Sequence, residues 1–148
     1  MGHVEIELIK RSADAYNRRD LDAYLACFHL DAELHPFASG VEGRTFRGHD
    51  EIRQFWAGLD EAFESVELHN EEFHDLGERA LALGWWRLRG RESGVELESK
   101  AGWIVEARGD KIAYLRSYGD PAEALRAAGL EDQTKARDGL RSEAPKRR

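Results

Sequence analysis

The feature that most constrains this chain is a change of hydrophobic period near residue 64. Before that point apolar residues recur at helical spacing, and after it apolar and polar residues alternate over four segments separated by short turns. Hairpin loops of a few residues make consecutive strands neighbours in a sheet. The sequence therefore predicts helices first and an antiparallel meander afterwards, which is an α+β fold.

Three helices are predicted in the first half of the chain. The first covers residues 4–17, where apolar residues mark one face and charged residues the other. Asp20 is a good N-cap for the second. The third begins at residues 48–50, and its predicted buried side consists of Ile52, Phe55, Trp56 and Leu59.

Strands and one more helix complete the predicted domain. The strands cover residues 31–37, 45–47, 66–75, 80–89, 95–107 and 111–118. Pro121 suits the first position of a short C-terminal helix. Residues 131–148 are charged and lack apolar periodicity, so we predict one domain over 1–130 and a mobile tail. A twisted sheet wrapped on helices forms a cone, and a cone has an interior.

Charge limits the partners that suit this chain. Its 148 residues include 29 acidic and 22 basic ones, and the net charge of −7 gives no general attraction for nucleic acid or anionic membranes. The single cysteine, Cys27, cannot form an internal disulfide. The N-terminus lacks a basic region followed by an apolar stretch. We therefore expect a cytoplasmic protein that binds neither nucleic acid nor a membrane.

The order of these elements resembles the SnoaL-like branch of the nuclear transport factor 2-like superfamily. The best local matches lie at residues 16–22, 46–52 and 110–121, and the resemblance covers roughly residues 4–130. It implies a cone-shaped, curved antiparallel sheet wrapped on the N-terminal helices, a pocket for a small-molecule ligand, and a homodimer. The superfamily includes isomerases, cyclases, epoxide hydrolases, dehydratases and non-catalytic binders, so fold alone gives little about chemistry.

Ketosteroid isomerases provide one comparison of catalytic residues. Their aspartate base stands just before a proline, and His35 holds that place before Pro36. Their catalytic tyrosine falls near Ser12, and their protonated aspartate falls near Ala101 or Gly102. The oxyanion hole of that family is therefore missing, which argues against steroid isomerisation.

Two other branches draw attention to the end of the last strand. Limonene-epoxide hydrolases have an arginine and a final aspartate there, matched by Arg116 and Asp120, and a further arginine matched by Arg87. Arg89 stands where their water-activating mechanism needs an aspartate, so that mechanism is incomplete. SnoaL-like cyclases use an aspartate near the end of the last strand, and Asp120 is similar in position.

Asp120 and His35 are the candidate catalytic residues. A carboxylate at the mouth of an apolar cone would have a raised pKa and could move a proton. A histidine can serve as a base near neutral pH. The structural alternatives are that Asp120 caps the helix beginning at Pro121, and that His35 is a hydrogen-bonded, partly buried histidine.

The candidate ligand-binding residues are charged or aromatic. By strand parity Arg116 and Tyr118 share one side of the last strand, which suits a polar pocket, a subunit interface or solvent. Arg87 or Arg116 would stabilise negative charge on oxygen. Broad apolar surfaces for a ligand would come from Trp56, Trp86 and Trp103. Core packing is the alternative for each tryptophan. Trp85 and Trp86 are adjacent, so one of them should line the cone and the other should face outward.

No metal site and no cofactor are expected. His69 and His74 stand five residues apart in a strand and would face opposite sides, which does not form a ready-made chelate. The resulting hypothesis is a small-molecule-binding protein, with isomerase, cyclase or hydratase chemistry by proton transfer on a largely apolar metabolite as its catalytic form. The alternative is a non-catalytic binding or interaction module of the same fold.

Overall fold

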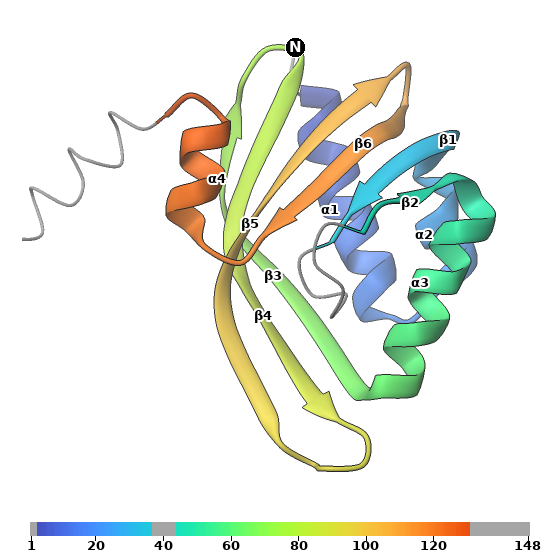
Figure 1. Cartoon of the computed structure of the whole chain (residues 1–148). Helices are drawn as coiled ribbons and strands as arrows, with labels where there is room; N and C mark the ends of the chain where they lie inside the picture. The colour runs from blue at the N-terminus through green and yellow to red at the C-terminus, as the bar shows by residue number, and fades with distance from the viewer. Residues whose placement is uncertain (1–2, 37–43, 131–148) are drawn as a thin grey trace, which may run out of the picture.

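The computed structural model of the chain describes residues 3–36 and 44–130, and Figure 1 shows its elements. The helices are α1 (His3–Asn17), α2 (Leu21–Ala26), α3 (Gly48–Ala62) and α4 (Pro121–Ala127). The strands are β1 (Phe28–His35), β2 (Phe46–Arg47), β3 (Phe63–Asp75), β4 (Arg79–Gly90), β5 (Glu96–Arg108) and β6 (Lys111–Tyr118). The predicted elements are present, although β1 and β3 each begin three residues earlier than predicted, and residue 37, the predicted end of the first strand, lies outside the described residues.

All of these strands form one 6-stranded sheet in the order β2-β1-β6-β5-β4-β3. The meander from β3 to β6 is antiparallel, as predicted. However, β1 runs parallel to β6, with Glu33 opposite Tyr114 and His35 opposite Arg116. A parallel pair needs a long crossover, and here α3 and the first three strands of the meander supply it. The α+β fold is confirmed, and its sheet is mixed rather than wholly antiparallel.

Helices cover the two faces of the sheet unequally. We call the face that carries α1 and α3 the inner face; α1 contacts β3, β4 and β5 there, while α3 packs against β1 (Figure 1). The main core lies between these helices and the sheet, and it includes the fully buried Leu8, Leu34 and Ile52. On the opposite, outer face, α4 packs against Leu81 and Ile104. The middle residues of β4 and β5 are therefore buried on both faces.

Strands β3 and β4 approach each other very closely at Gly84. The pairing register of β3 shifts between Asn70 and Glu72, which is a bulge. Next to this bulge, a Cβ atom added at Gly84 would lie 1.8 Å from the carbonyl oxygen of His69, so a residue without a side chain is required there. Bulges increase the local bend and twist of a strand. This bulge therefore contributes to the strong curvature of β3, β4 and β5 in Figure 1.

The end of α1 is fastened to the edge strand β3 by one side chain. The Asn17 Nδ2 group donates to the Leu68 carbonyl and the Asn17 Oδ1 atom accepts from the Leu68 N–H, both at 2.8 Å. The amide thus occupies part of the sheet edge that would otherwise be open. Arg19, with a left-handed φ of 60°, then turns the chain toward α2. Asp20 caps α2 as predicted, because its side chain accepts from the Ala23 N–H at 3.1 Å.

The predicted charged tail, residues 131–148, lies outside the described residues. The domain boundary near residue 130 therefore stays a prediction. Across the segments that the structure describes, no helix combines the length and apolar character needed to cross a membrane.

Candidate functional site

A cavity lies inside the cone, between α1, α3 and the inner face of the sheet. The space open to the centre of a water-sized sphere is about 70 Å³, and a single water needs roughly 10–15 Å³ by that measure. Its apolar walls include Leu34, Phe55, Trp86, Trp103 and Leu115. Its neutral polar groups come from Ser12, Tyr16, Tyr24, Asn70 and Ser117. The cavity therefore has room for a small organic group and several hydrogen-bonding atoms.

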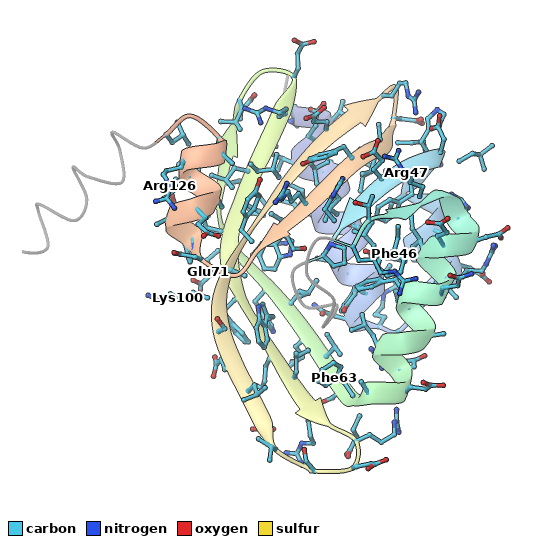
Figure 2. The ribbon with its side chains drawn as sticks, in the orientation of Figure 1. Phe46, Arg47, Phe63, Glu71, Lys100 and Arg126 are labelled. Carbon is cyan, nitrogen blue, oxygen red and sulfur yellow. The ribbon has the colours of Figure 1, made fainter. Side chains whose placement is uncertain are left out.

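Strand parity explains which side chains reach the cavity. Trp86 of β4, Trp103 of β5 and Ser117 of β6 all point from the inner face. Trp85 points outward, where its ring stacks on His69 with centroids 4.1 Å apart. The prediction that one of two adjacent tryptophans lines the cone is therefore confirmed. In Figure 2, Glu71, which accepts a hydrogen bond from Trp85, lies on the same side as Lys100 and Arg126, away from Phe46.

Two buried tyrosines, Tyr16 and Tyr24, line the cavity. Burial raises the pKa of Tyr16 and of Tyr24 well above the ordinary value, so both phenols stay protonated over the physiological range. Trp56 packs behind them, with ring centroids 5.4 Å from Tyr16 and 5.0 Å from Tyr24. Trp56 is not among the lining residues, so the alternative of core packing describes it. A protonated phenol can donate a hydrogen bond to an uncharged ligand.

The structure places both candidate catalytic residues away from the cavity lining. Asp120 is exposed, and its Oδ1 atom accepts from the Ala122 N–H at 2.9 Å, which makes it the N-cap of α4. His35 is half-buried on the outer side of β1, between the cavity-lining residues Leu34 and Pro36. A catalytic role for Asp120 or His35 stays a prediction, and the cavity geometry gives it no support.

The charged and phenolic binding candidates also lie on the outer face. Arg87 pairs with Glu67 at 3.1 Å, and Arg116 lies over the ring of Tyr118 at 5.3 Å from its centroid. Tyr118 packs against the cluster beneath α4. The last strand thus turns Arg116 and Tyr118 away from the cavity, which corrects the option that they face a pocket. Of all the candidates, Trp86 and Trp103 line the cavity.

The cavity wall is notable for its lack of strong acids and bases. Within residues 3–36 and 44–130, no Asp, Glu, His, Lys or Arg lines it. The described residues also contain no group of three or more His, Cys, Asp or Glu side chains placed to hold a metal ion. From the sequence, Ser12 is notable only as the position of a missing tyrosine, and Tyr16 and Tyr24 are not assigned to the site. A helical pattern of apolar residues predicts which side chains are buried, but it does not predict a cavity beside them.

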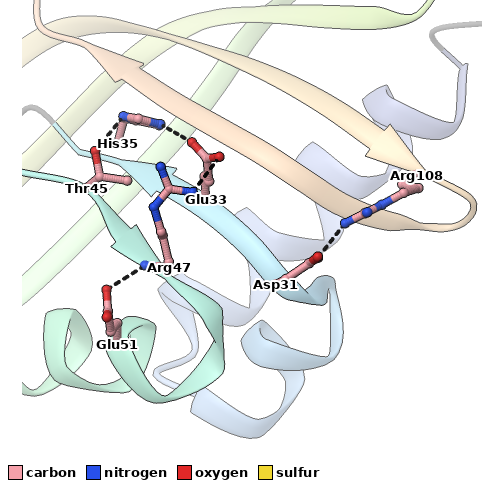
Figure 3. Close-up of polar contacts among 7 residues, drawn as sticks. All are labelled: Asp31, Glu33, His35, Thr45, Arg47, Glu51 and Arg108. Atoms are coloured by element: carbon pink, nitrogen blue, oxygen red, sulfur yellow. Dashed lines mark hydrogen bonds and ion pairs between the residues drawn. The ribbon is translucent and has the colours of Figure 1, made fainter.

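A chain of polar contacts lies on the outer side of β1, close to the cavity (Figure 3). His35 Nε2 lies 3.1 Å from Glu33, and His35 Nδ1 lies 3.1 Å from the Thr45 hydroxyl. Arg47 donates to the other oxygen of Glu33 at 2.8 Å, and Arg108 pairs with Asp31. The hydrogen bond to His35, followed by the Arg47 charge, holds the pKa of Glu33 below its ordinary value of 4.5.

Glu33→Gln is expected to destabilise the protein at pH 7 and to have a smaller effect at pH 3. A carboxylate whose pKa is lowered in the folded state adds stability above its unfolded pKa, and loses that contribution as the pH falls through the folded pKa. Urea unfolding of the wild type and the variant at both pH values measures the difference. Exposed Glu78, in the β3–β4 turn, provides the control variant Glu78→Gln. A Glu33→Gln effect of equal size at both pH values would contradict the assignment.

Comparisons with known proteins agree with this fold. The family described as SnoaL-like domain matches residues 9–115. No curated protein matches the sequence significantly. An NTF2-like protein of unknown function from Burkholderia pseudomallei is 25% identical, with a TM-score of 0.71, over 83% of this chain and 95% of that chain.

Two further solved structures contain small molecules. TerC, co-crystallised with polyporic acid, is 22% identical with a TM-score of 0.70, over 85% of this chain and 98% of that chain. A protein with a ketosteroid isomerase-like fold from Catenulispora acidiphila, in complex with trimethylamine, is 18% identical with a TM-score of 0.69, over 84% of this chain and 93% of that chain. At these identities the likeness extends to the fold alone.

Proposed function

The chain belongs to the SnoaL-like domain family, and from this premise we propose that its cavity binds a small, uncharged, largely apolar molecule. The observation that carries the proposal is the wall of the cavity, which in the described residues is aliphatic, aromatic or neutral and polar. An ion entering it would lose its hydration without gaining a counter-charge, which is costly. An apolar molecule gains free energy in proportion to the surface that it buries.

The same observation favours binding over proton-transfer catalysis. The catalytic hypothesis requires Asp120 or His35 to reach the ligand, and both are engaged elsewhere, in the α4 cap and in the Glu33 contact. The tyrosine hydroxyls, whose pKa is raised, are poor bases but adequate hydrogen-bond donors. TerC with polyporic acid and the protein with trimethylamine support the general point that this fold accommodates small organic molecules.

The predicted homodimer and cytoplasmic location rest on the sequence alone. The homodimer is implied by family resemblance and stays a prediction, as does the cytoplasmic location. The outer face of β3 to β5 is largely charged, with Arg87 between Glu67 and Glu98 and Arg89 paired with Glu96. A partner subunit on this face would therefore meet ion pairs rather than a broad apolar surface.

A pair of fluorescent probes tests the proposal. N-phenyl-1-naphthylamine is uncharged and becomes bright in apolar surroundings, and its sulfonated analogue has the same rings with an added negative charge. We expect the uncharged probe to bind at least about tenfold more tightly, because the cavity offers no cation to a sulfonate. Equal binding of the two probes, or no binding of the uncharged one, would contradict the proposal.

Variants of one strand locate the probe. Ser117→Phe fills the cavity from β6 and is expected to weaken binding of the uncharged probe about tenfold or more, since the added ring occupies its space. Arg116→Phe adds the same ring to the outer side of β6 and should leave binding unchanged. Asp120→Asn and His35→Ala should also bind normally. A loss of binding in Arg116→Phe with normal binding in Ser117→Phe would place the probe outside the cavity.

A further inference from the structure

The inner face of the sheet continues past the cavity as an apolar strip on the β4–β5 hairpin. Leu88 lines the cavity and is buried, and Leu97 stands directly opposite it in the β4–β5 register. Directly opposed residues of an antiparallel pair share a face, so Leu97 lies on the cavity side. Val95 lies two residues before Leu97, immediately ahead of the start of β5 at Glu96. We use the name mouth strip for Leu88, Leu97 and Val95.

Two of the three residues of the mouth strip, Leu97 and Val95, are exposed although they are apolar. Leu97 is 54% exposed and Val95 is 56% exposed, and among the described residues they are two of only four large apolar side chains in that class, with Val4 and Leu30. Scattered exposed apolar residues are ordinary, but neighbouring ones that continue a binding cavity indicate a binding surface.

The charged residues at the start of the same strand are placed on its other side. Glu96 pairs with Arg89 at 2.7 Å, and Glu98 lies 3.8 Å from Arg87. The end of β5 therefore separates its side chains by chemistry, with ion pairs on the outer face and Leu97 on the inner face. An antiparallel sheet with one solvated face normally carries polar residues on that face, so the exposed Leu97 on the cavity side is consistent with a surface that a ligand covers.

The hairpin that carries the mouth strip is held in position. Arg91 donates to the Asp60 carbonyl at 3.0 and 2.7 Å and to the Phe63 carbonyl at 3.1 Å, which ties the hairpin to the end of α3 and the start of β3. The Gly90 N–H donates to the Val95 carbonyl at 2.9 Å. A surface fixed in this way binds a ligand with a smaller ordering cost.

We propose that the cavity and the mouth strip form one continuous site for an elongated, uncharged molecule, with one end inside the cone and an alkyl chain lying along Leu88, Leu97 and Val95. The inference rests on the proposed function and adds the shape of the ligand. Ser99 stands opposite Trp86, and four residues of extended chain, the separation of Ser99 from Val95, span about 13 Å. A compact ligand would leave this length of apolar surface uncovered.

A chain-length series of primary alcohols, from butan-1-ol to decan-1-ol, tests the proposal by displacing N-phenyl-1-naphthylamine. In the wild type the apparent affinity should rise roughly fourfold with each methylene up to the longest members. In the double variant Val95→Ser, Leu97→Ser the short alcohols should bind as before, and the rise should stop at an intermediate length. Leu30→Ser, which removes an exposed leucine elsewhere, should leave the whole series unchanged.

The outcomes separate the two proposals. If the probe binds but the series stops rising at short chains in the wild type, or rises equally in the double variant, the elongated site is wrong and the cavity proposal stands. If neither probe nor alcohols bind, both are wrong. If the double variant keeps the full series but loses self-association in sedimentation velocity, a second copy of the chain covers the strip, and the inference is overturned.

Discussion

Gly84→Ala is expected to lower the free energy of unfolding by about 3 kcal/mol or more, at the severe end of overpacking substitutions. The added Cβ atom would lie 1.8 Å from the His69 carbonyl oxygen and 2.8 Å from its carbon, which are backbone atoms that cannot rotate away. Relief requires β3 and β4 to separate beside the bulge, where Asn70 and Trp86 approach the cavity. We therefore expect weaker probe binding together with the loss of stability.

Urea unfolding measures this effect, and Gly58→Ala is its matched control. Gly58 lies on the exposed side of α3, and a Cβ atom there meets nothing within 4 Å. The same substitution should stabilise the protein by about 0.5–1 kcal/mol, because alanine is the better helix former. Similar unfolding midpoints for Gly84→Ala and the wild type would show that β3 and β4 are not in this close contact.

Trp56→Ala is expected to cost about 3–5 kcal/mol, the range for removing a large buried aromatic side chain. Trp56 is 6% exposed and contacts both cavity tyrosines, so its removal leaves a void behind Tyr16 and Tyr24. The tyrosine hydroxyls would lose their fixed positions, and selectivity between probes with and without a hydrogen-bond acceptor should decline.

Trp85→Ala is the control for Trp56→Ala, because it makes the same substitution at a tryptophan on the outer face. Trp85 is half-buried on the outer face, where it stacks on His69 and donates to Glu71 at 3.2 Å. We expect a loss of about 1 kcal/mol and unchanged probe binding, since a surface aromatic pair contributes little beyond its buried area. Thermal and urea unfolding of both variants, with probe titration, check the contrast. A larger loss in Trp85→Ala would assign the structural role to the outer tryptophan.

Much of the fold follows from local sequence. The switch of period near residue 64 predicts the four-stranded meander, and the Asp20 cap marks the start of α2. The adjacency of Trp85 and Trp86 requires that they face opposite ways, and the structure bears this out. These features depend on neighbouring residues alone, so a single sequence contains the information.

The candidate site is less predictable because it depends on long-range pairing. The register between β5 and β6 shifts at Ala113, which places Ile112 on the inner side although parity groups it with Tyr114. Leu115 and Ser117 of β6 line the cavity, whereas Tyr118 packs against the cluster beneath α4 on the other face. Asp120 satisfies the pattern of a family aspartate and of an N-cap equally well, and only the structure shows its bond to Ala122. The close contact at Gly84 likewise has no local signal.

The parallel pairing of β1 with β6 has a consequence for synthesis on the ribosome. Cys27 accepts a hydrogen bond from the Ile112 N–H at 2.8 Å, and Leu34 is opposite Leu115. Strand β1 therefore emerges early but has to wait for its partner until nearly the whole domain has been translated. Nascent chains that stop before β6 lack the strand between β1 and β5, so their apolar interior is exposed. Such chains are expected to bind chaperones. The cavity can bind a ligand only after β6 has been translated and has paired with β1.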